Sequence, residues 1–258
     1  MNLEDFKKQN GYFIDGIWYP RVTAIVQIKN KPALYYFYAK AESYADANRK
    51  KMAAANEGKI VHSILEAIVS GKEPMVPEKY VGFKLGFEGF LAEHGFLSRQ
   101  EWIERRVKHP AHRYSGTFDL LAEIDGVFSL MDIKTASAVY DDYRLQTSAY
   151  LYALNDEPWL SGENGNKYVL PKEVEKRYIL RVNQKQVCEK CGTVKKLRDM
   201  GDKIENNKNH CPHQFSPTQA DWELKEFDQP AQDFQAFLHC KGLWEWDNRQ
   251  ALAELGYL

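Results

Sequence analysis

Two aspartates near the middle of the chain lie at positions where they could share a metal ion. The apolar-rich runs Tyr114–Ile124 and Val127–Lys134 flank Asp125-Gly126. An Asp-Gly pair between two such runs predicts a two-residue β-hairpin turn. Counting outward from that turn places Asp119 opposite Asp132. The pattern therefore predicts two carboxylates that face each other across a strand pair.

Opposed carboxylates repel each other unless a positive charge lies between them, because side chains at such positions are only about 5 Å apart. Lys134 shares the face of Asp132, and the carbonyl of Ile133 lies beside them. Oxygen ligands favour Mg²⁺ or Mn²⁺, which polarise phosphoryl oxygens and lower the pKa of bound water. The alternative is a plain salt bridge of Lys134 on a solvated sheet face. The leucines on the same face favour the metal interpretation.

Composition limits the classes of protein that need to be considered. The chain has 258 residues, of which 44% are hydrophobic, so it can bury the core of one domain with a small appendage. A net charge of -1 means that any phosphate binding must come from local basic patches. We expect a cytoplasmic protein with no membrane partner, because no apolar run approaches about 20 residues and the first ten residues are polar.

Further candidate residues lie on predicted helices and on one predicted strand. A helix at 51–69 would place His62 and Glu66 one turn apart, although a lone histidine beside an apolar stripe is usually a satisfied core residue. A helix at 139–154 would place Gln146 and Tyr150 on one face. The strand predicted at 102–109 carries a basic edge, which could contact phosphate or be ordinary solvated surface. The tyrosines of a helix predicted at 33–49 are expected to pack internally.

Three motifs in order resemble those of the PD-(D/E)XK nucleases, in particular the RecB-like branch. They are Gly-x-x-Asp at 116–119, Asp-x-Lys-Thr at 132–135, and Gln-x-x-x-Tyr at 146–150. Gly58-x-x-x-His62 resembles the helical motif by which this branch adds an imidazole ligand. The segment 19–25 resembles the entry segment of a viral and organellar exonuclease subgroup, with Arg21 in place of a serine.

The resemblance implies a fold of the α/β (α+β) class with a restriction-endonuclease-like core. Such a core has a central mixed sheet in αβββαβ order, flanked by helices. It also implies a metal held by His62, Asp119, Asp132 and the Ile133 carbonyl, with Glu66 as a weaker candidate. Family members often carry a glutamate on the strand predicted at 102–109, so Glu104 is a further candidate.

The same resemblance implies an activity, that of a Mg²⁺- or Mn²⁺-dependent DNA nuclease. An exonuclease acting on single-stranded ends is expected, with replication or recombination proteins as partners and a virus as one source of such a chain. The residues expected to carry catalysis are Asp119, Asp132, Lys134, Gln146 and Tyr150. Lys134 would position or deprotonate the attacking water, while Gln146 and Tyr150 would support its surroundings.

A second metal site is predicted from cysteine spacing. Cys188-x-x-Cys191 followed by Gly192 has the form of a zinc knuckle. Cys211 and His213 would complete a tetrahedral set, with His210 as the alternate fourth ligand, although this second half departs from Cys-Pro-x-Cys. The expected division is a nuclease domain at 1–187 and 214–258, with a zinc-binding insertion at 188–213. An iron–sulfur cluster is disfavoured, because related nucleases place one cysteine upstream of the active site.

A function of another class would fit the same motifs. The chain could be a zinc-stabilised nucleic-acid-binding or assembly protein in which the nuclease fold is catalytically silent. The retention of Asp119, Asp132 and Lys134 argues against this alternative, because a silent site has no reason to keep opposed charges.

Overall fold

The hairpin predicted around Asp125-Gly126 is present and lies at the centre of the sheet. Its strands are β5 (Tyr114–Ile124) and β6 (Val127–Lys134). Asp125 and Gly126 have φ angles of 51° and 82°, the left-handed values that a type I′ turn requires at both central residues. The register starts at Ile124 opposite Val127, as the turn predicts. The hairpin thus fixes which residues of β5 and β6 can meet.

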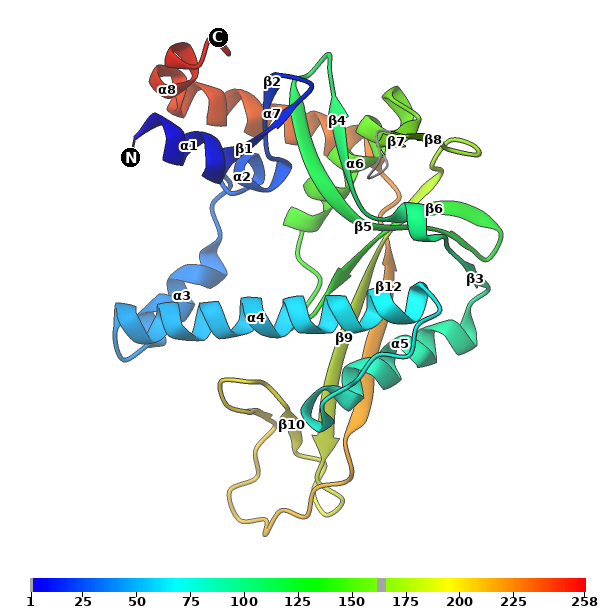
Figure 1. Ribbon diagram of the computed structural model, residues 1–258. Helices are drawn as coiled ribbons and strands as arrows, with labels where there is room; N and C mark the ends of the chain where they lie inside the picture. Colours follow the sequence, from blue (N-terminus) through cyan, green and yellow to red (C-terminus); the bar gives the residue numbers. More distant parts are fainter. Residues whose placement is uncertain (1, 162–165) are drawn as a thin grey trace.

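The computed structural model describes residues 2–161 and 166–258 and has an α/β architecture with a central mixed sheet (Figure 1). On one side of the hairpin, β5 pairs antiparallel with β4 (Ile103–His109) and β3 (Phe96–Leu97). On the other side, β6 pairs in parallel with β9 (Lys176–Val187), and β9 pairs antiparallel with β12 (Gln219–Glu226). Two short strands, β10 (Val194–Lys196) and β11 (Lys203–Glu205), extend the sheet beyond β9.

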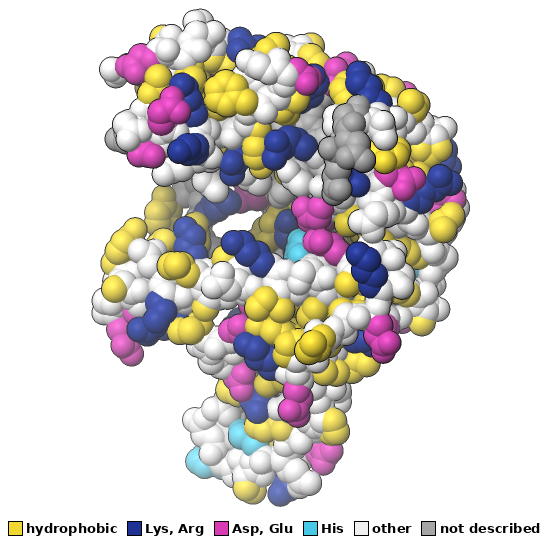
Figure 2. Space-filling model, viewed as in Figure 1, with side chains coloured by type: hydrophobic (Ala, Val, Ile, Leu, Met, Phe, Trp, Pro, Cys, Tyr) yellow, Lys and Arg dark blue, Asp and Glu magenta, His cyan; other side chains and the backbone are white. Residues whose placement is uncertain are grey.

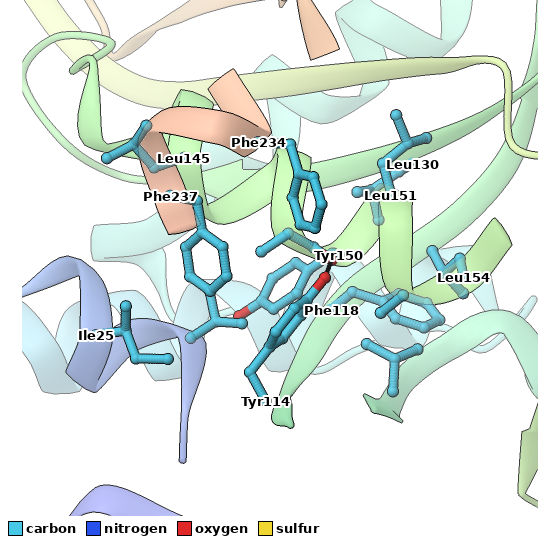
Figure 3. Close-up of a cluster of buried hydrophobic side chains, with 14 of the residues drawn as sticks. Ile25, Tyr114, Phe118, Leu130, Leu145, Tyr150, Leu151, Leu154, Phe234 and Phe237 are labelled. Atoms are coloured by element: carbon cyan, nitrogen blue, oxygen red, sulfur yellow. Dashed lines mark hydrogen bonds between the residues drawn. The ribbon is translucent and has the colours of Figure 1, made fainter. Parts of the chain in front are cut away.

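Helices flank this sheet and cover two apolar cores. The helices α4 (Tyr44–Val69) and α5 (Val81–Glu93) pack on one core, which includes Leu120 and Ile133. The helices α2 (Val22–Val26), α6 (Asp142–Asp156) and α7 (Pro230–Asp247) pack on the other, which contains Tyr114, Phe118 and Tyr150 (Figure 3). The order α4, β4, β5, β6, α6, β9 contains the predicted sequence of elements, and the predicted central mixed sheet flanked by helices is confirmed.

None of the helices in the described ranges combines the length and apolar character that crossing a bilayer requires. The remaining elements are α1 (Leu3–Asn10), β1 (Gly11–Ile14), β2 (Ile17–Pro20), α3 (Pro32–Lys40), β7 (Trp159–Ser161), β8 (Lys167–Val169), α8 (Arg249–Glu254) and two 3-10 turns, Glu78–Tyr80 and Gln100–Trp102.

The helical region before the sheet differs from the prediction in two ways. The second helix starts earlier, at Tyr44, because the Ser43 side chain caps it by accepting a hydrogen bond from the Asp46 amide at 3.1 Å. The first helix, α3, therefore ends at Lys40. The expectation that its tyrosines pack internally is wrong for Tyr35 and Tyr36, which are 64% and 70% exposed because α3 stands away from the sheet (Figure 1).

Candidate active site and metal centres

The predicted pair of aspartates lies where the β5–β6 ladder ends. The paired residues run from Ile124–Val127 to Leu120–Met131, one pair short of Asp119–Asp132. The Asp119 carboxylate instead accepts a hydrogen bond from the Ile133 amide at 2.6 Å through Oδ2. Direct pairing of the two aspartates is therefore not observed, because one side chain bonds to the neighbouring strand's backbone.

Three potential ligands from separate elements converge next to this point. The imidazole Nδ1 of His62, on α4, lies 3.7 Å from Asp119 Oδ2 and 4.0 Å from Glu104 Oε1. One ligand atom from each of these residues lies within 4.8 Å of the other two. Glu104 has a left-handed φ of 49° and its side chain is 40% exposed. The cluster is thus open to solvent on the side of β4.

The orientation of the His62 ring leaves one nitrogen facing the carboxylates. Nε2 lies 2.9 Å from the Ile133 carbonyl oxygen. A carbonyl only accepts, so Nε2 carries the hydrogen and donates it. Metal-bound histidines usually hold their second nitrogen in this way. Because the Ile133 carbonyl, which we expected to be a metal ligand, already accepts from His62, its observed contact is one that orients the imidazole.

The charge on His62 depends on its acidic neighbours. Burial lowers the pKa of His62, but Asp119 and then Glu104 together raise it by more, so that it reaches about 9. Without a metal, the ring is therefore protonated at neutral pH and partly neutralises the carboxylates. A divalent ion bound through Nδ1 would displace that proton.

Asp132 and Lys134 form a buried pair beside the cluster. Asp132 is fully buried, and the Lys134 Nζ lies 2.6 Å from its Oδ2. Despite this close ion pair, neither carboxylate oxygen has a hydrogen bond of acceptable geometry among the described residues. Burial raises the pKa of Asp132; Lys134 opposes this and Asp119 adds to it. A buried carboxylate without hydrogen bonds is costly; Lys134 offsets the charge at Oδ2, and a metal ion could satisfy Oδ1.

Lys134 has two neighbours that keep it charged. Burial lowers the pKa of Lys134, but Asp132 and Asp119 raise it by more, so the net shift is upward. Its ammonium also lies 5.2 Å from the centre of the Tyr143 ring, on α6. The lysine is therefore held as a cation in the metal-free protein.

The other motif residues support the site from the core below it. The Gln146 Nε2 donates to the Tyr150 hydroxyl at 3.1 Å. Tyr150 is buried, and a Cβ at Gly116 would overlap its ring. In Figure 3 the Tyr150 ring lies among Tyr114, Phe118 and the side chains of α7. The glycine of the first motif is thus explained by close packing, while the contact observed for Gln146 is with Tyr150 and not with Lys134.

The weaker candidate, Glu66, lies beside the cluster and outside the set of three converging ligands. Burial and then Glu104 raise the pKa of Glu66 to about 7, so it is near half-protonation at neutral pH. The more favourable third ligand is Glu104. Ile103 pairs with Leu120 and Arg105 with Phe118, which puts Glu104 opposite Asp119 across β4 and β5. The family resemblance had named Glu104 as a further candidate, but strand counting could not place it, because the β4–β5 connection contains no turn signal as clear as Asp-Gly.

A second cluster contains Cys188, Cys191, Cys211 and His213, as the cysteine spacing predicts. One ligand atom from each lies within 4.8 Å of the others. The Sγ atoms of Cys188 and Cys211 are 3.9 Å apart, close to the separation of ~3.8 Å between sulfurs on a zinc tetrahedron. The cluster can bind a metal such as zinc. The alternate ligand His210 is exposed and outside the set.

The ring of His213 is also oriented for ligation. Its Nε2 lies 3.0 Å from the Asn207 side-chain oxygen, while Nδ1 faces Cys191 at 3.4 Å. On the other half of the site, the Gly192 amide donates to the Cys188 carbonyl, and Gly192 has a φ of 73°. This tight turn brings the first two cysteines together.

A groove of about 570 Å³ adjoins the first cluster. Its lining includes His62 and Lys134, together with Lys50 from α4 and Arg198 from the segment between the cysteine pairs. Figure 2 shows an opening next to helix α4, with Lys and Arg side chains around its rim. The linker before α3 is tied to α6 by Asp142, which pairs with Lys29 and Lys31 at 2.9 Å each.

The chain matches no protein-family model and no curated protein. An activity must therefore be inferred from the ligand types, the buried lysine and the basic groove.

Proposed function

We propose that the chain is a metal-dependent DNA nuclease of the PD-(D/E)XK type, in its RecB-like branch. One observation carries the proposal. His62, Glu104 and Asp119 converge beside a buried Asp132–Lys134 pair whose carboxylate oxygens lack hydrogen bonds among the described residues. The motif resemblance supports the same conclusion, with a restriction-endonuclease-like core at 1–187 and 214–258 and a zinc-binding insertion at 188–213.

The donor set fits Mg²⁺ or Mn²⁺. Three carboxylates and one imidazole are hard or borderline ligands, and the site contains no thiol. We propose His62, Glu104, Asp119 and Asp132 as the residues that hold the ion, with Ile133 orienting His62. When bound, such an ion lowers the pKa of a coordinated water and polarises a phosphoryl oxygen.

Lys134 supplies positive charge where a phosphodiester would react. Its raised pKa keeps the proton on Nζ, which favours stabilisation of developing negative charge over proton abstraction. The Asp132 carboxylate lies 2.6 Å from the ammonium, and the centre of the Tyr143 ring lies 5.2 Å from it. Lys134 therefore acts as a fixed electrostatic group that also positions the attacking water.

The shape of the groove favours strands with free ends as substrate. A groove along α4 contains Lys50, Lys134 and Arg198, and Figure 2 shows an opening next to the same helix. Basic side chains along a groove bind the backbone of single strands, and exposed aromatic residues such as Tyr35 and Tyr36 can stack with bases. A strand that passes through an opening must enter by an end, so we propose exonuclease action on single-stranded DNA ends.

The test compares end-labelled linear DNA with covalently closed circular single-stranded DNA, each with Mg²⁺, Mn²⁺ or EDTA. We expect degradation of linear DNA with either ion, little cutting of circles, and none in EDTA. Cutting of circles at a similar rate would contradict exonuclease action. DNA binding without cleavage under every metal condition would instead support the alternative, a zinc-stabilised binding or assembly protein with a silent nuclease fold.

A further inference from the structure

The segment between the two halves of the cysteine cluster folds back onto α4. Arg198 pairs with Glu57 of α4 at 2.7 Å through Nη1, and the Asp199 amide donates to the other Glu57 oxygen at 2.9 Å. Glu57 is buried, so it depends on these two contacts for its negative charge. The segment thus supplies both partners of a buried carboxylate on the helix that carries His62.

The same arginine also connects to the segment that follows Lys134. Arg198 donates through Nη2 to the side-chain oxygen of Asn183, on β9. The amide of that same asparagine donates to the Ala136 carbonyl at 2.7 Å. Ala136 is two residues after Lys134, and Glu57 precedes His62 on α4 by about one and a half turns. Arg198 is therefore hydrogen-bonded directly to α4, which carries His62, and linked through Asn183 to the segment that follows Lys134.

The segment is also held by the pairing of β10 with β9 and by the Asp199 side chain, which contacts Lys79 at 3.1 Å and Tyr80 at 2.8 Å, but it buries little apolar surface. Within 189–214, all of which is described, only Thr193 is buried, and β10 and β11 have three residues each. A segment that buries so little apolar surface needs another constraint to stay ordered. The ligands Cys188 and Cys191 precede the Arg198 segment and Cys211 and His213 follow it, so one ion would close it into a loop.

We propose that Cys188, Cys191, Cys211 and His213 form a structural zinc site that holds Arg198 as a positioning residue for the active site. With zinc bound, Arg198 holds Glu57 of α4 and, through Asn183, the backbone after Lys134. Its guanidinium also forms part of the wall of the groove. This role rests on the proposed function for its effect on cleavage, but not for its effect on α4.

The experiment compares Cys211→Ser and Arg198→Ala with the parent and with Lys208→Ala, a change at an exposed position of the same segment. Three quantities are measured: zinc per chain, Mn²⁺ affinity, and hydrogen exchange over residues 54–62. We expect about one zinc per chain in the parent, in Arg198→Ala and in Lys208→Ala, and loss of zinc in Cys211→Ser. Both Cys211→Ser and Arg198→Ala should weaken Mn²⁺ binding roughly 10- to 100-fold and speed exchange in α4.

A rescue variant separates positioning from general destabilisation. Arg198→Ala leaves Glu57 buried with its charge uncompensated by the arginine, so adding Glu57→Gln should recover part of the Mn²⁺ affinity. Where the parent cleaves DNA, kcat should fall more than KM changes in Arg198→Ala, because ligand and lysine geometry is disturbed.

The outcomes distinguish this proposal from the nuclease assignment. A parent that contains no zinc before any exposure to chelator would overturn the zinc site. Loss of zinc in Cys211→Ser with unchanged exchange in α4 and unchanged Mn²⁺ affinity would overturn the coupling. A parent that cleaves no DNA would contradict the proposed function only, since zinc content and exchange in α4 are read without DNA.

Discussion

The two ligand clusters are built in opposite ways. The oxygen-rich cluster takes one residue each from α4, β4 and β5, from position 62 to position 119, with Asp132 of β6 beside it, and its Glu104 is 40% exposed. The cysteine cluster takes four residues from two turns within 26 positions, and these four are enough to close a tetrahedral site. A metal in an open site on rigid elements keeps positions that water or substrate can occupy. A closed site on turns instead mainly stabilises the chain around it. The difference agrees with the proposal that the first cluster carries chemistry and the second supports the chain around it.

Among the substitutions that test the different roles of the two clusters, Lys134→Ala is expected to have the largest effect. This change removes the charge that faces the substrate but no metal ligand, so cleavage should fall about 10²- to 10⁴-fold while Mn²⁺ binding and zinc content are retained. Single-turnover cleavage at saturating Mn²⁺ measures the loss, with Lys208→Ala as the control. Turnover equal to that of the parent would exclude Lys134 from the mechanism.

A pair of glycine substitutions tests whether one region supports the whole fold and the other only itself. Gly116→Ala forces a Cβ into the Tyr150 ring, so the free energy of unfolding should fall by about 1–3 kcal/mol. Gly192→Ala meets no neighbouring atom but strains a residue at a φ of 73°. It should therefore lower zinc affinity and leave the denaturation midpoint of the core nearly unchanged.

Denaturant titration and zinc competition with a chelator measure these two results. The comparison would fail if Gly192→Ala destabilised the core as much as Gly116→Ala does. It would also fail if Gly116→Ala had no effect on the midpoint, because Tyr150 would then not be fixed by the packing seen in Figure 3.

The smallest effect is expected for Asp132→Asn. Because burial raises the pKa of Asp132 above that of the unfolded chain, its ionised form opposes folding at pH values above both pKa values and has no such effect below about pH 4. In EDTA at pH 7.5, the asparagine variant should therefore be more stable by roughly 0.2–1 kcal/mol, because removing a buried charge near Asp119 is partly offset by losing the contact with Lys134. The difference should disappear near pH 4.

Adding Mn²⁺ should reverse that order, since the parent gains binding energy that the variant has largely lost. Thermal melts at the two pH values, with and without metal, measure both parts. A parent that is the more stable protein in EDTA at pH 7.5 and gains nothing from Mn²⁺ would show that Asp132 does not belong to a metal site.

Local patterns in the sequence were sufficient to predict the hairpin and the cysteine cluster. The Asp-Gly turn fixed the register from Ile124 to Leu120, and the cysteine spacing identified three of the four ligands and both histidine candidates for the fourth. Each prediction depended on neighbours in the sequence, whose backbone geometry is set by the turn itself.

Contacts between distant segments were not predictable in this way. Arg198 meets Glu57 across 141 positions, with no periodic signal at either residue. The β5–β6 ladder ends one pair early because the Asp119 carboxylate accepts the hydrogen bond of the Ile133 amide. Counting residues from the turn cannot predict such a bond between a side chain and the backbone. The sequence likewise predicted a helix with tyrosines near α3, but not that this helix stands apart from the sheet and leaves Tyr35 and Tyr36 exposed.

The long strand β9 sets the distance between the two clusters. Ile179 of β9 pairs with Asp132, and Cys188 follows nine positions later, one residue beyond the end of the strand. At about 3.3 Å per residue, the two centres are roughly 30 Å apart along the strand. This is between three and four Debye lengths at physiological ionic strength, so direct electrostatic coupling between ions bound at the two clusters would be weak. An effect of zinc on metal binding at the first cluster would therefore have to pass through the protein, and the contacts of Arg198 with Glu57 and Asn183 provide such a route.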